Sequence, residues 1–341
     1  MIFKNYLNSE IISIIKLYFT YLEYYTGCEP VRSLKGRDFL SVNDLTSEEL
    51  MFLIDTAYNL KQRFYGGERI IPVLKGRTVM MIFQKPSTRT RISFEQAIVQ
   101  LGGHSISVNW QELQLGRGET IADTARVLDR YVDGIVARVY KHSDLEELAK
   151  YANIPVINAL SDREHPCQAV GDMLTIYEKK GRLKGVTVAY VGDGGNNVAH
   201  SLLLAASKLG VNVRIGTAEG YDPHHDILRV AEEEASRSGS VIEIVRTPEE
   251  AVRAADVVYT DVWISMGQEA EREKRIKDLG KFRVTPELMK LAKKDAIFMH
   301  CLPAMRGMEV VDEVIDGVWS VVWDQAENRL HAQKALLALL I

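Results

Sequence analysis

Two segments of this chain open alike and then run through the same pattern. Lys75-Gly-Arg-Thr-Val79 and Lys184-Gly-Val-Thr-Val188 each lead into an apolar run, which ends at a polar turn followed by an amphipathic stretch. Short apolar runs that alternate with helical periodicity are typical of α/β domains with a parallel sheet. The repeat therefore predicts two similar domains, each with a mainly parallel sheet flanked by helices. Ligands of such sheets bind beyond the carboxyl ends of the strands, so we expect the active site in the cleft between the domains.

Periodicity locates the individual elements. Strands are expected at residues 78–83, 105–108, 134–138, 155–158, 186–191, 212–216, 241–245, 257–260, 297–300 and 318–321. Thr46 and Glu49 have the spacing of a capping box at the start of a helix. Further helices are expected after residue 87 and at 120–131, 144–150, 168–180, 197–209, 227–236 and 331–341.

Residues 1–32 differ from the rest and are interpreted as an N-terminal extension. The stretch 11–25 is rich in Ile, Leu and Tyr, but Lys16 and Glu23 interrupt it. The apolar run is too short to span a bilayer, and no small-residue cleavage site follows it. An added amphipathic helix or a start codon placed too early are the two explanations, and we expect no membrane association.

Composition excludes several classes of partner and cofactor. A net charge of −4 gives no reason to expect nucleic acid. Three scattered cysteines, Cys28, Cys167 and Cys301, predict no disulfide framework and favour the reducing cytoplasm. No Cys/His spacing resembles a zinc site, and His224-His225-Asp226 lies in a turn and is interpreted as a solvated loop. We therefore expect no metal.

The turn after residues 78–83 carries the clearest chemical signal. Ser87-Thr-Arg-Thr90 follows an apolar strand and begins a helix at once. Backbone N–H groups, hydroxyls and the helix dipole then converge on one point, which favours an anion such as phosphate. Arg89 can bind two phosphate oxygens with its guanidinium. The alternative is an ordinary solvated helix cap at Ser87 or Thr88.

Other strand ends are also polar. They carry Arg138, His165-Pro-Cys-Gln168, Gly192-Asp-Gly-Gly-Asn-Asn197, Asp261-Val-Trp-Ile-Ser-Met-Gly267 and His300-Cys-Leu-Pro303. Taken singly, His165 could be a buried imidazole, Asp261 a helix cap and Cys301 a small buried apolar group. Because all fall on one edge of the two sheets, together they favour a site. Gly192 and Gly194 fit the start of a dinucleotide-binding motif, but Asn197 stands where its third glycine belongs, so this match is weak.

These motifs resemble those of the carbamoyltransferases. Ser87-Thr-Arg-Thr90 and His165-Pro-Cys-Gln168 are similar to the elements of carbamoyl phosphate users in general. Ser265-Met-Gly267 and His300-Cys-Leu-Pro303 resemble the ornithine branch of the family. The likeness runs from about Ser33 to the C-terminus. It implies a carbamoyl phosphate-binding domain at 33–167, joined by the C-terminal helix 326–341, and an ornithine-binding domain at 168–325.

The resemblance implies roles for residues on the carbamoyl phosphate side. Ser87, Thr88, Arg89 and Thr90 would bind the phosphate, and Thr90, Arg138 and His165 the carbonyl oxygen. The carbamoyl amino group would meet Gln168 and the backbone of Cys301 and Leu302, with Pro166 and Cys167 in the same turn and Arg329 nearby. Gln114 matches a position that reaches the ligand from a neighbouring subunit, which implies a homotrimer or a multiple of trimers. Arg89, Arg138, His165 and Cys301 would be catalytic.

For ornithine, the resemblance implies contacts with Asn197, Asp261, Ser265 and Met266. The turn before Asn197 is one glycine longer than in some members, which leaves Asn196 as the alternative. Attack of the δ-amino group near Cys301 would give citrulline and phosphate, in arginine biosynthesis or the arginine deiminase pathway, without a cofactor. The charged segment 265–282 is expected to be a mobile lid.

Three other readings stay open. The chain could carbamoylate another amine or amino acid, although the Ser265-Met-Gly267 loop argues against this. It could be a catalytically silent relative that binds ligands or a partner enzyme. The glycines at 192 and 194 leave a nicotinamide-dependent dehydrogenase as the weakest alternative.

Overall fold

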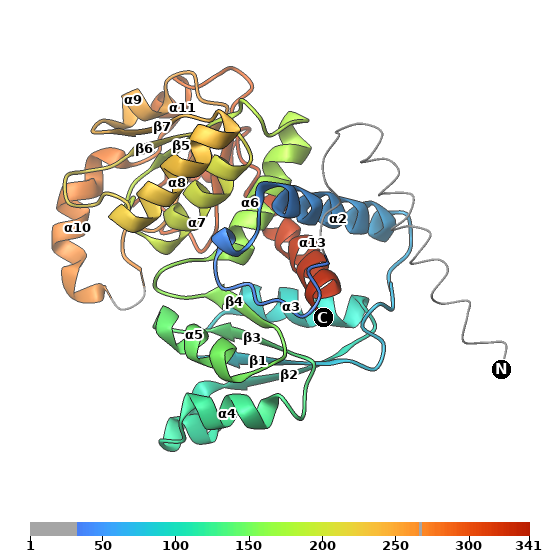
Figure 1. Ribbon diagram of the computed structural model, residues 1–341. Helices are drawn as coiled ribbons and strands as arrows, with labels where there is room; N and C mark the ends of the chain where they lie inside the picture. Colours follow the sequence, from blue (N-terminus) through green and yellow to red (C-terminus); the bar gives the residue numbers. More distant parts are fainter. Residues whose placement is uncertain (1–32, 266–267) are drawn as a thin grey trace. The chain divides into compact units, whose positions relative to one another are not determined.

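The computed structural model describes residues 33–265 and 268–341, and its core is two parallel sheets (Figure 1). The first sheet has the order β2-β1-β3-β4, and the second has the order β7-β6-β5-β8-β9. All strand pairs are parallel. The strands are β1 (Thr78–Phe83), β2 (His104–Asn109), β3 (Gly134–Arg138), β4 (Val156–Leu160), β5 (Thr187–Val191), β6 (Asn212–Gly216), β7 (Ile242–Val245), β8 (Val257–Thr260) and β9 (Ile297–His300). The predicted fold class is confirmed.

Helices flank both sheets. They are α2 (Ser47–Tyr65), α3 (Thr88–Gln100), α4 (Ile121–Leu128), α5 (His142–Tyr151), α6 (Pro166–Lys180), α7 (Asn197–Lys208), α8 (His225–Ser238), α9 (Pro248–Val252), α10 (Arg272–Leu279), α11 (Pro286–Met289), α12 (Asp312–Ile315) and α13 (Val322–Leu340). The capping box predicted for α2 is confirmed, since Thr46 and Glu49 each bond the other's backbone N–H. Among the described residues, no helix combines the length and apolar character needed to cross a bilayer.

The two similar sequence openings fold in the same way. Gly76 and Gly185 take φ angles of 79° and 78°, where glycine is strongly favoured, just before β1 and β5. Thr78 N–H then donates to Asp133 Oδ2 at 2.8 Å, and Thr187 N–H donates to Asp256 Oδ2 at 2.9 Å. The repeat in the sequence is therefore a structural repeat at the start of β1 and of β5.

One predicted element was wrong. Residues 318–321 make only one isolated bridge, Ser320 with Phe298, because the chain turns at Gly317 and enters α13 at once. The segment 265–282, expected to be a mobile lid, contains the helix α10 among its described residues, and its mobility stays a prediction. Arg275 and Leu279 are buried there, so this helix has one packed face, which the charged sequence of the helix does not reveal.

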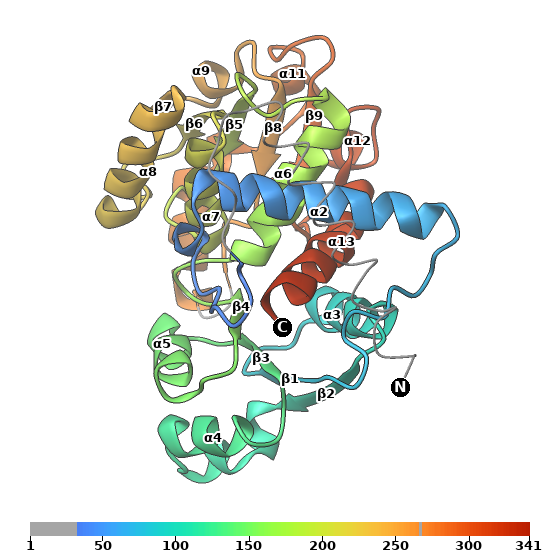
Figure 2. The same ribbon diagram turned by 45° about the vertical axis from the view of Figure 1, so that its right-hand side comes forward.

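α6 and α13 connect the two sheets. α13 packs against α2, α3 and α6, and the three helices α2, α6 and α13 lie together in both views (Figures 1 and 2). Lys61 Nζ on α2 donates to Glu178 on α6 at 2.9 Å and to Asn328 on α13 at 2.7 Å. This packing places the next residue of α13, Arg329, beside α3 and α6.

Candidate active site

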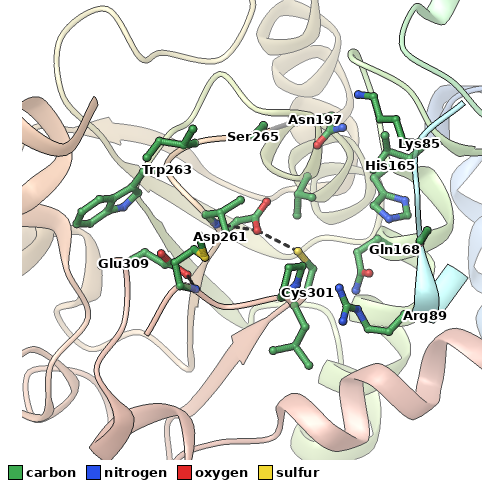
Figure 3. A pocket seen from close by; sticks show the side chains of 18 of the residues that line it. Lys85, Arg89, His165, Gln168, Asn197, Asp261, Trp263, Ser265, Cys301 and Glu309 are labelled. Atoms are coloured by element: carbon green, nitrogen blue, oxygen red, sulfur yellow. Dashed lines mark hydrogen bonds between the residues drawn. The ribbon is translucent and has the colours of Figure 1, made fainter. Parts of the chain in front are cut away.

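One cavity of about 380 Å³ lies at the carboxyl ends of strands from both sheets. Arg89, His165 and Gln168 enter it from one side, and Asp261 and Cys301 face them from the other (Figure 3). The predicted site residues that line this cavity are Ser87, Arg89, Thr90, Arg138, His165, Gln168, Asn197, Asp261, Ser265, Cys301, Leu302 and Arg329. The structure therefore brings together residues that are up to 242 positions apart, from Ser87 to Arg329.

Four predicted residues lie elsewhere among those the structure describes. Thr88 begins α3 beside the cavity without lining it, and Pro166 begins α6. Cys167 is fully buried, and its thiol donates to the carbonyl of Asn158 at 3.2 Å. Gln114 is exposed at the start of a 3-10 turn, Gln114–Arg117. Met266 lies outside the described residues.

One end of the cavity is strongly cationic. Arg89, Arg138 and Arg329 line it together with Lys85, which the sequence analysis missed although it stands two residues before Ser87. Burial, and then the nearby Arg329, lowers the pKa of Arg138 to about 10, so this guanidinium stays charged at neutral pH. Burial and Arg138 also lower the pKa of Lys85. Cations held this close, beside the N-terminus of α3 that Ser87 caps, form a site for a compact anion.

His165 lies against this cationic group and is 4% exposed. Its backbone N–H donates to Ser201 Oγ at 2.9 Å, and Nδ1 has no hydrogen-bond partner among the described residues. Burial and the neighbouring Arg329, Arg138 and Arg89 hold the pKa of His165 well below its usual range. The imidazole is therefore neutral at physiological pH, and one ring N–H can donate a hydrogen bond into the cavity.

The opposite wall contains a thiol paired with a carboxylate. Cys301 Sγ donates to Asp261 Oδ1 at 3.1 Å, and Val262 N–H donates to the same oxygen at 2.8 Å. Burial and Asp261 raise the pKa of Cys301 well above its usual range, so the thiol is neutral. Burial also raises the pKa of Asp261. The Asp261 carboxylate in this wall is a candidate hydrogen-bond acceptor for an ammonium group of a ligand.

Asp261, His300 and Cys301 bring possible metal-ligand atoms within 4.8 Å of one another. The geometry of His300 argues against a metal site. Its Nδ1 accepts from Leu302 N–H at 2.9 Å, and its Nε2 lies 3.1 Å from Glu309 Oε1. Both ring nitrogens are therefore engaged within the protein, and the cluster is better described as a hydrogen-bonded wall.

The two asparagines before and at the start of α7 have different surroundings. Asn197 lines the cavity, and its Nδ2 donates to the carbonyl of Ser161 at 2.6 Å. Asn196 caps α7 by accepting from Ala199 N–H at 2.8 Å, and it donates to the Tyr190 hydroxyl at 2.6 Å. Asn197 therefore lines the cavity itself, whereas Asn196 is engaged in capping α7 and in hydrogen bonds to Tyr190 and Asp261.

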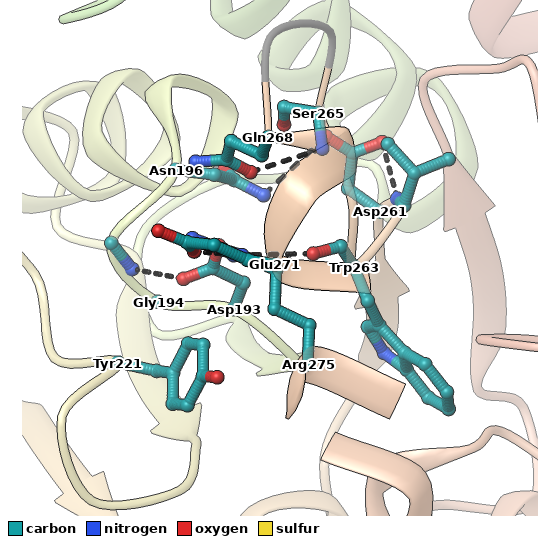
Figure 4. A network of polar contacts seen from close by, with 12 residues as sticks. Asp193, Gly194, Asn196, Tyr221, Asp261, Trp263, Ser265, Gln268, Glu271 and Arg275 are labelled. Carbon is teal, nitrogen blue, oxygen red and sulfur yellow. Dashed lines mark hydrogen bonds and ion pairs between the residues drawn. The ribbon is translucent and has the colours of Figure 1, made fainter. Parts of the chain in front are cut away.

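A buried ion pair anchors the segment that follows Asp261 (Figure 4). Arg275 Nη1 on α10 lies 2.6 Å from Asp193 Oδ2 and donates to the carbonyl of Trp263 at 3.2 Å. Asp193 belongs to the turn that leads into α7. Arg275 therefore ties Trp263, two residues after Asp261, to the turn that carries the asparagines.

Other residues also line the cavity although no role was predicted for them. Val262, Trp263, Ile264 and Pro303 belong to the recognised motifs, whereas Leu160, Val198, Glu269, Arg272, Met305, Met308 and Glu309 lie outside them. Several directly adjoin a motif, so proximity in the sequence was a usable signal for them. Met308 and Glu309 had no such signal, because only the return of the chain toward β9 places them at the cavity.

Comparison with known proteins gives a consistent result over nearly the whole chain. Residues 37–178 match the family description "Aspartate/ornithine carbamoyltransferase, carbamoyl-P binding domain", and residues 184–340 match its "Asp/Orn binding domain". The ornithine carbamoyltransferase of Staphylothermus marinus is 63% identical over 312 residues, 91% of this chain and 99% of the relative. The anabolic ornithine carbamoyltransferase of Pyrococcus furiosus is 59% identical over 313 residues, 91% of this chain and 98% of the relative.

Solved structures agree with the sequence matches. The ornithine carbamoyltransferase structure from Pyrococcus furiosus has a TM-score of 0.88 and 59% identity, and the match covers 91% of this chain and 98% of that one. The ornithine transcarbamoylase structure from Giardia lamblia, at 35% identity, has a TM-score of 0.80 over 89% of this chain and 97% of that one.

Proposed function

This chain belongs to the aspartate/ornithine carbamoyltransferase family, and we propose that it transfers the carbamoyl group of carbamoyl phosphate to the δ-amino group of L-ornithine. The products are L-citrulline and phosphate. The observation that carries this proposal is the cavity itself, in which three arginines and a neutral histidine face a carboxylate–thiol pair. An anionic donor and a cationic acceptor are thereby drawn to opposite walls of one small space.

On the donor side, Ser87, Thr88, Arg89 and Thr90 bind the phosphate at the N-terminus of α3. Thr90 accepts from Arg329 Nη2 at 2.9 Å, so its hydroxyl hydrogen is directed elsewhere and can donate to the ligand. Arg138 and the neutral N–H of His165 donate to the carbonyl oxygen, together with Thr90. Gln168 and the carbonyls of Cys301 and Leu302 accept from the carbamoyl amino group.

On the acceptor side, Asp261 binds the α-ammonium group of ornithine, and Asn197 and the backbone near Ser265 and Met266 bind its carboxylate. The uncharged δ-amino group attacks the carbamoyl carbon beside Cys301, and the carbonyl oxygen becomes an oxyanion. Arg138 and His165 stabilise this charge with donors that are already in place. The carbon–oxygen bond to phosphate then breaks, its electron pair stays on the phosphate oxygen, and the attacking nitrogen gives up one proton to the departing phosphate.

We propose that the protein works as a homotrimer or a multiple of trimers. Two features support this assembly. Gln114 is exposed and does not line its own chain's cavity, as suits a residue that completes a neighbour's site. Ile92 and Val99 on α3 and Ile106 on the edge strand β2 are exposed apolar side chains on two elements that contact each other, which suits a subunit contact. We also propose the cytoplasm as its compartment.

A citrulline assay with carbamoyl phosphate and a panel of amines tests the function. We expect citrulline from ornithine and no carbamoylated product above background from putrescine or aspartate. Putrescine lacks the carboxylate that Asn197 binds. Aspartate has no δ-amino group to reach the carbamoyl carbon while Asp261 holds its α-ammonium group. Preferred turnover of another amine would replace ornithine as the substrate. Protein that is folded and trimeric but forms no product with any amine would refute the proposal.

A further inference from the structure

A buried carboxylate lies behind the cavity, and the reaction as proposed does not use it. Asp172 stands one helical turn after Gln168 on α6 and is 0% exposed. Its Oδ1 accepts from Gln168 Nε2 at 2.8 Å and from Gln325 Nε2 at 2.7 Å, and its Oδ2 accepts from the Tyr259 hydroxyl at 3.1 Å. Three donors from three elements converge on it, so this position requires a group that only accepts.

The contact with Asp172 decides which end of the Gln168 amide faces the ligand. Because Nε2 is held by the carboxylate, Oε1 is left for the cavity side, where Arg329 Nη1 donates to it at 2.9 Å. A carboxylate that only accepts and a guanidinium that only donates fix opposite ends of the same amide. An amide oxygen has two acceptor positions, so one remains for a ligand donor.

The second glutamine extends the same arrangement to the opposite wall. Gln325 Nε2 is held by Asp172, and Gln325 Oε1 accepts from the backbone N–H of His300 at 2.9 Å. His300 directly precedes Cys301 and Leu302, whose carbonyls are the other acceptors proposed for the carbamoyl amino group. One buried carboxylate therefore orients, through two glutamines, both the side-chain acceptor and the chain segment that supplies the backbone acceptors.

We propose that Asp172 is a positioning residue that sets donor specificity, by keeping Gln168 in the orientation that selects an amino group over a methyl group. The proposal rests on the proposed function, and it predicts discrimination between carbamoyl phosphate and acetyl phosphate, which differ only in this group. A methyl group leaves the acceptors without partners in a dry site, and sites built in this way reject such analogues strongly.

Calorimetric titration of the full-length protein can measure this selectivity with stable ligands. Phosphonoacetamide carries the amino group, 2-oxopropylphosphonate carries a methyl in its place, and inorganic phosphate reports the anion site alone. We expect the wild-type protein to bind the amide at least about 100-fold more tightly than the ketone. In Asp172→Asn, one side of residue 172 becomes a donor and conflicts with either Tyr259 or the two glutamines. We expect the ratio of the affinity for the amide to the affinity for the ketone to fall by about tenfold or more, with the affinity for inorganic phosphate unchanged.

Two further variants separate positioning from general damage. Asp256→Asn removes another buried carboxylate, which accepts from Thr187 N–H and directly precedes β8, the strand that carries Tyr259. This variant should leave the affinity ratio unchanged. Tyr259→Phe removes the hydroxyl that donates to Asp172 and accepts from Gln325 Nε2, and should lower the ratio about threefold. Tyr259→Phe decides the question if Asp172→Asn does not fold.

An unchanged ratio in both Asp172→Asn and Tyr259→Phe would overturn the inference. So would an equal loss of affinity for all three ligands, because this is what a purely structural role predicts. If the wild-type protein makes citrulline but shows no preference for the amide, the inference alone fails. If it makes no citrulline, the proposed function fails first.

Discussion

Replacing Arg275 with methionine should destabilise the protein through the partner that it leaves behind. Asp193 is 3% exposed, and without Arg275 its carboxylate keeps only the Gly195 N–H at 3.0 Å and loses its charge partner. In the wild-type protein burial raises the pKa of Asp193 above 3.8, and the guanidinium of Arg275 offsets part of this rise. In Arg275→Met the pKa of Asp193 rises further, because only the burial effect is left.

The loss in free energy of unfolding has an upper limit, because Asp193 can bind a proton in the folded variant. Its cost then cannot exceed the free energy of protonating a carboxyl group of pKa 3.8 at the working pH. At pH 7 the limit is about 1.4 kcal/mol times the difference between 7 and 3.8, which is about 4 kcal/mol, and at pH 5 it is about 2 kcal/mol. Breaking a buried ion pair costs about 3–5 kcal/mol. We therefore expect Arg275→Met to lose about 3–4 kcal/mol at pH 7 and no more than about 2 kcal/mol at pH 5.

Urea unfolding at both pH values, followed by tryptophan fluorescence at one fixed protein concentration, measures this loss. Arg229→Met is the matched control, because Arg229 and Glu233 form an exposed pair on α8, and it should cost less than about 1 kcal/mol. The reasoning is refuted if Arg275→Met loses less than about 1 kcal/mol at pH 7, or if the loss is the same at pH 5. Arg275 also holds the carbonyl of Trp263, so the variant should raise KM for ornithine more than KM for carbamoyl phosphate.

Three other changes test the site and the core. His165→Ala removes a donor to the oxyanion and should lower kcat by about 10²–10³-fold in steady-state assays. A loss under about tenfold would assign His165 another role. In calorimetry, Arg89→Ala should weaken the affinity for carbamoyl phosphate, and Asp261→Asn should weaken the affinity for ornithine, each by about tenfold or more. An equal loss of affinity for both ligands in either variant would contradict the role assigned to that residue. Burial raises the pKa of Glu164 to about 7, so the folded protein binds a proton there that the unfolded chain releases above pH 4.5. The free energy of unfolding should therefore fall by up to about 3 kcal/mol as pH rises from 4.5 to 7. In urea titrations at pH 5 and 8, Glu164→Gln should remove this part of the pH dependence.

The sequence predicted the elements well where a local rule fixes them. Capping of α2 by Thr46 and Glu49 depends on four consecutive residues, and the strands at 212–216, 257–260 and 297–300 were placed at their observed bounds. The capped turn at Ser87 was likewise visible, because a strand, a hydroxyl cap and a helix start follow one another directly. These features need only neighbouring backbone groups and side-chain periodicity.

The predictions failed where distant packing outweighs local preference. Residues 318–321 are apolar enough for a strand, but the turn at Gly317 and the start of α13 leave room for one bridge with Phe298. The charged segment around α10 offers no apolar stripe, yet Arg275 is buried in it because Asp193 supplies a counter-charge from another element. Apolar periodicity in a sequence indicates a helix with an apolar face, but it does not indicate a helix whose buried side chain belongs to an ion pair.

By itself the sequence determined two parallel α/β domains, the strand ends that line the cavity, and the family to which the chain belongs. Only the tertiary structure decided how the side chains meet, for example that Arg329 on the last helix donates to Thr90 and Gln168, and that Asp172 fixes the Gln168 amide. The reason is physical. Secondary structure follows from interactions within a few residues, whereas the orientation of a buried polar group depends on donors and acceptors that packing brings from separate helices and strands.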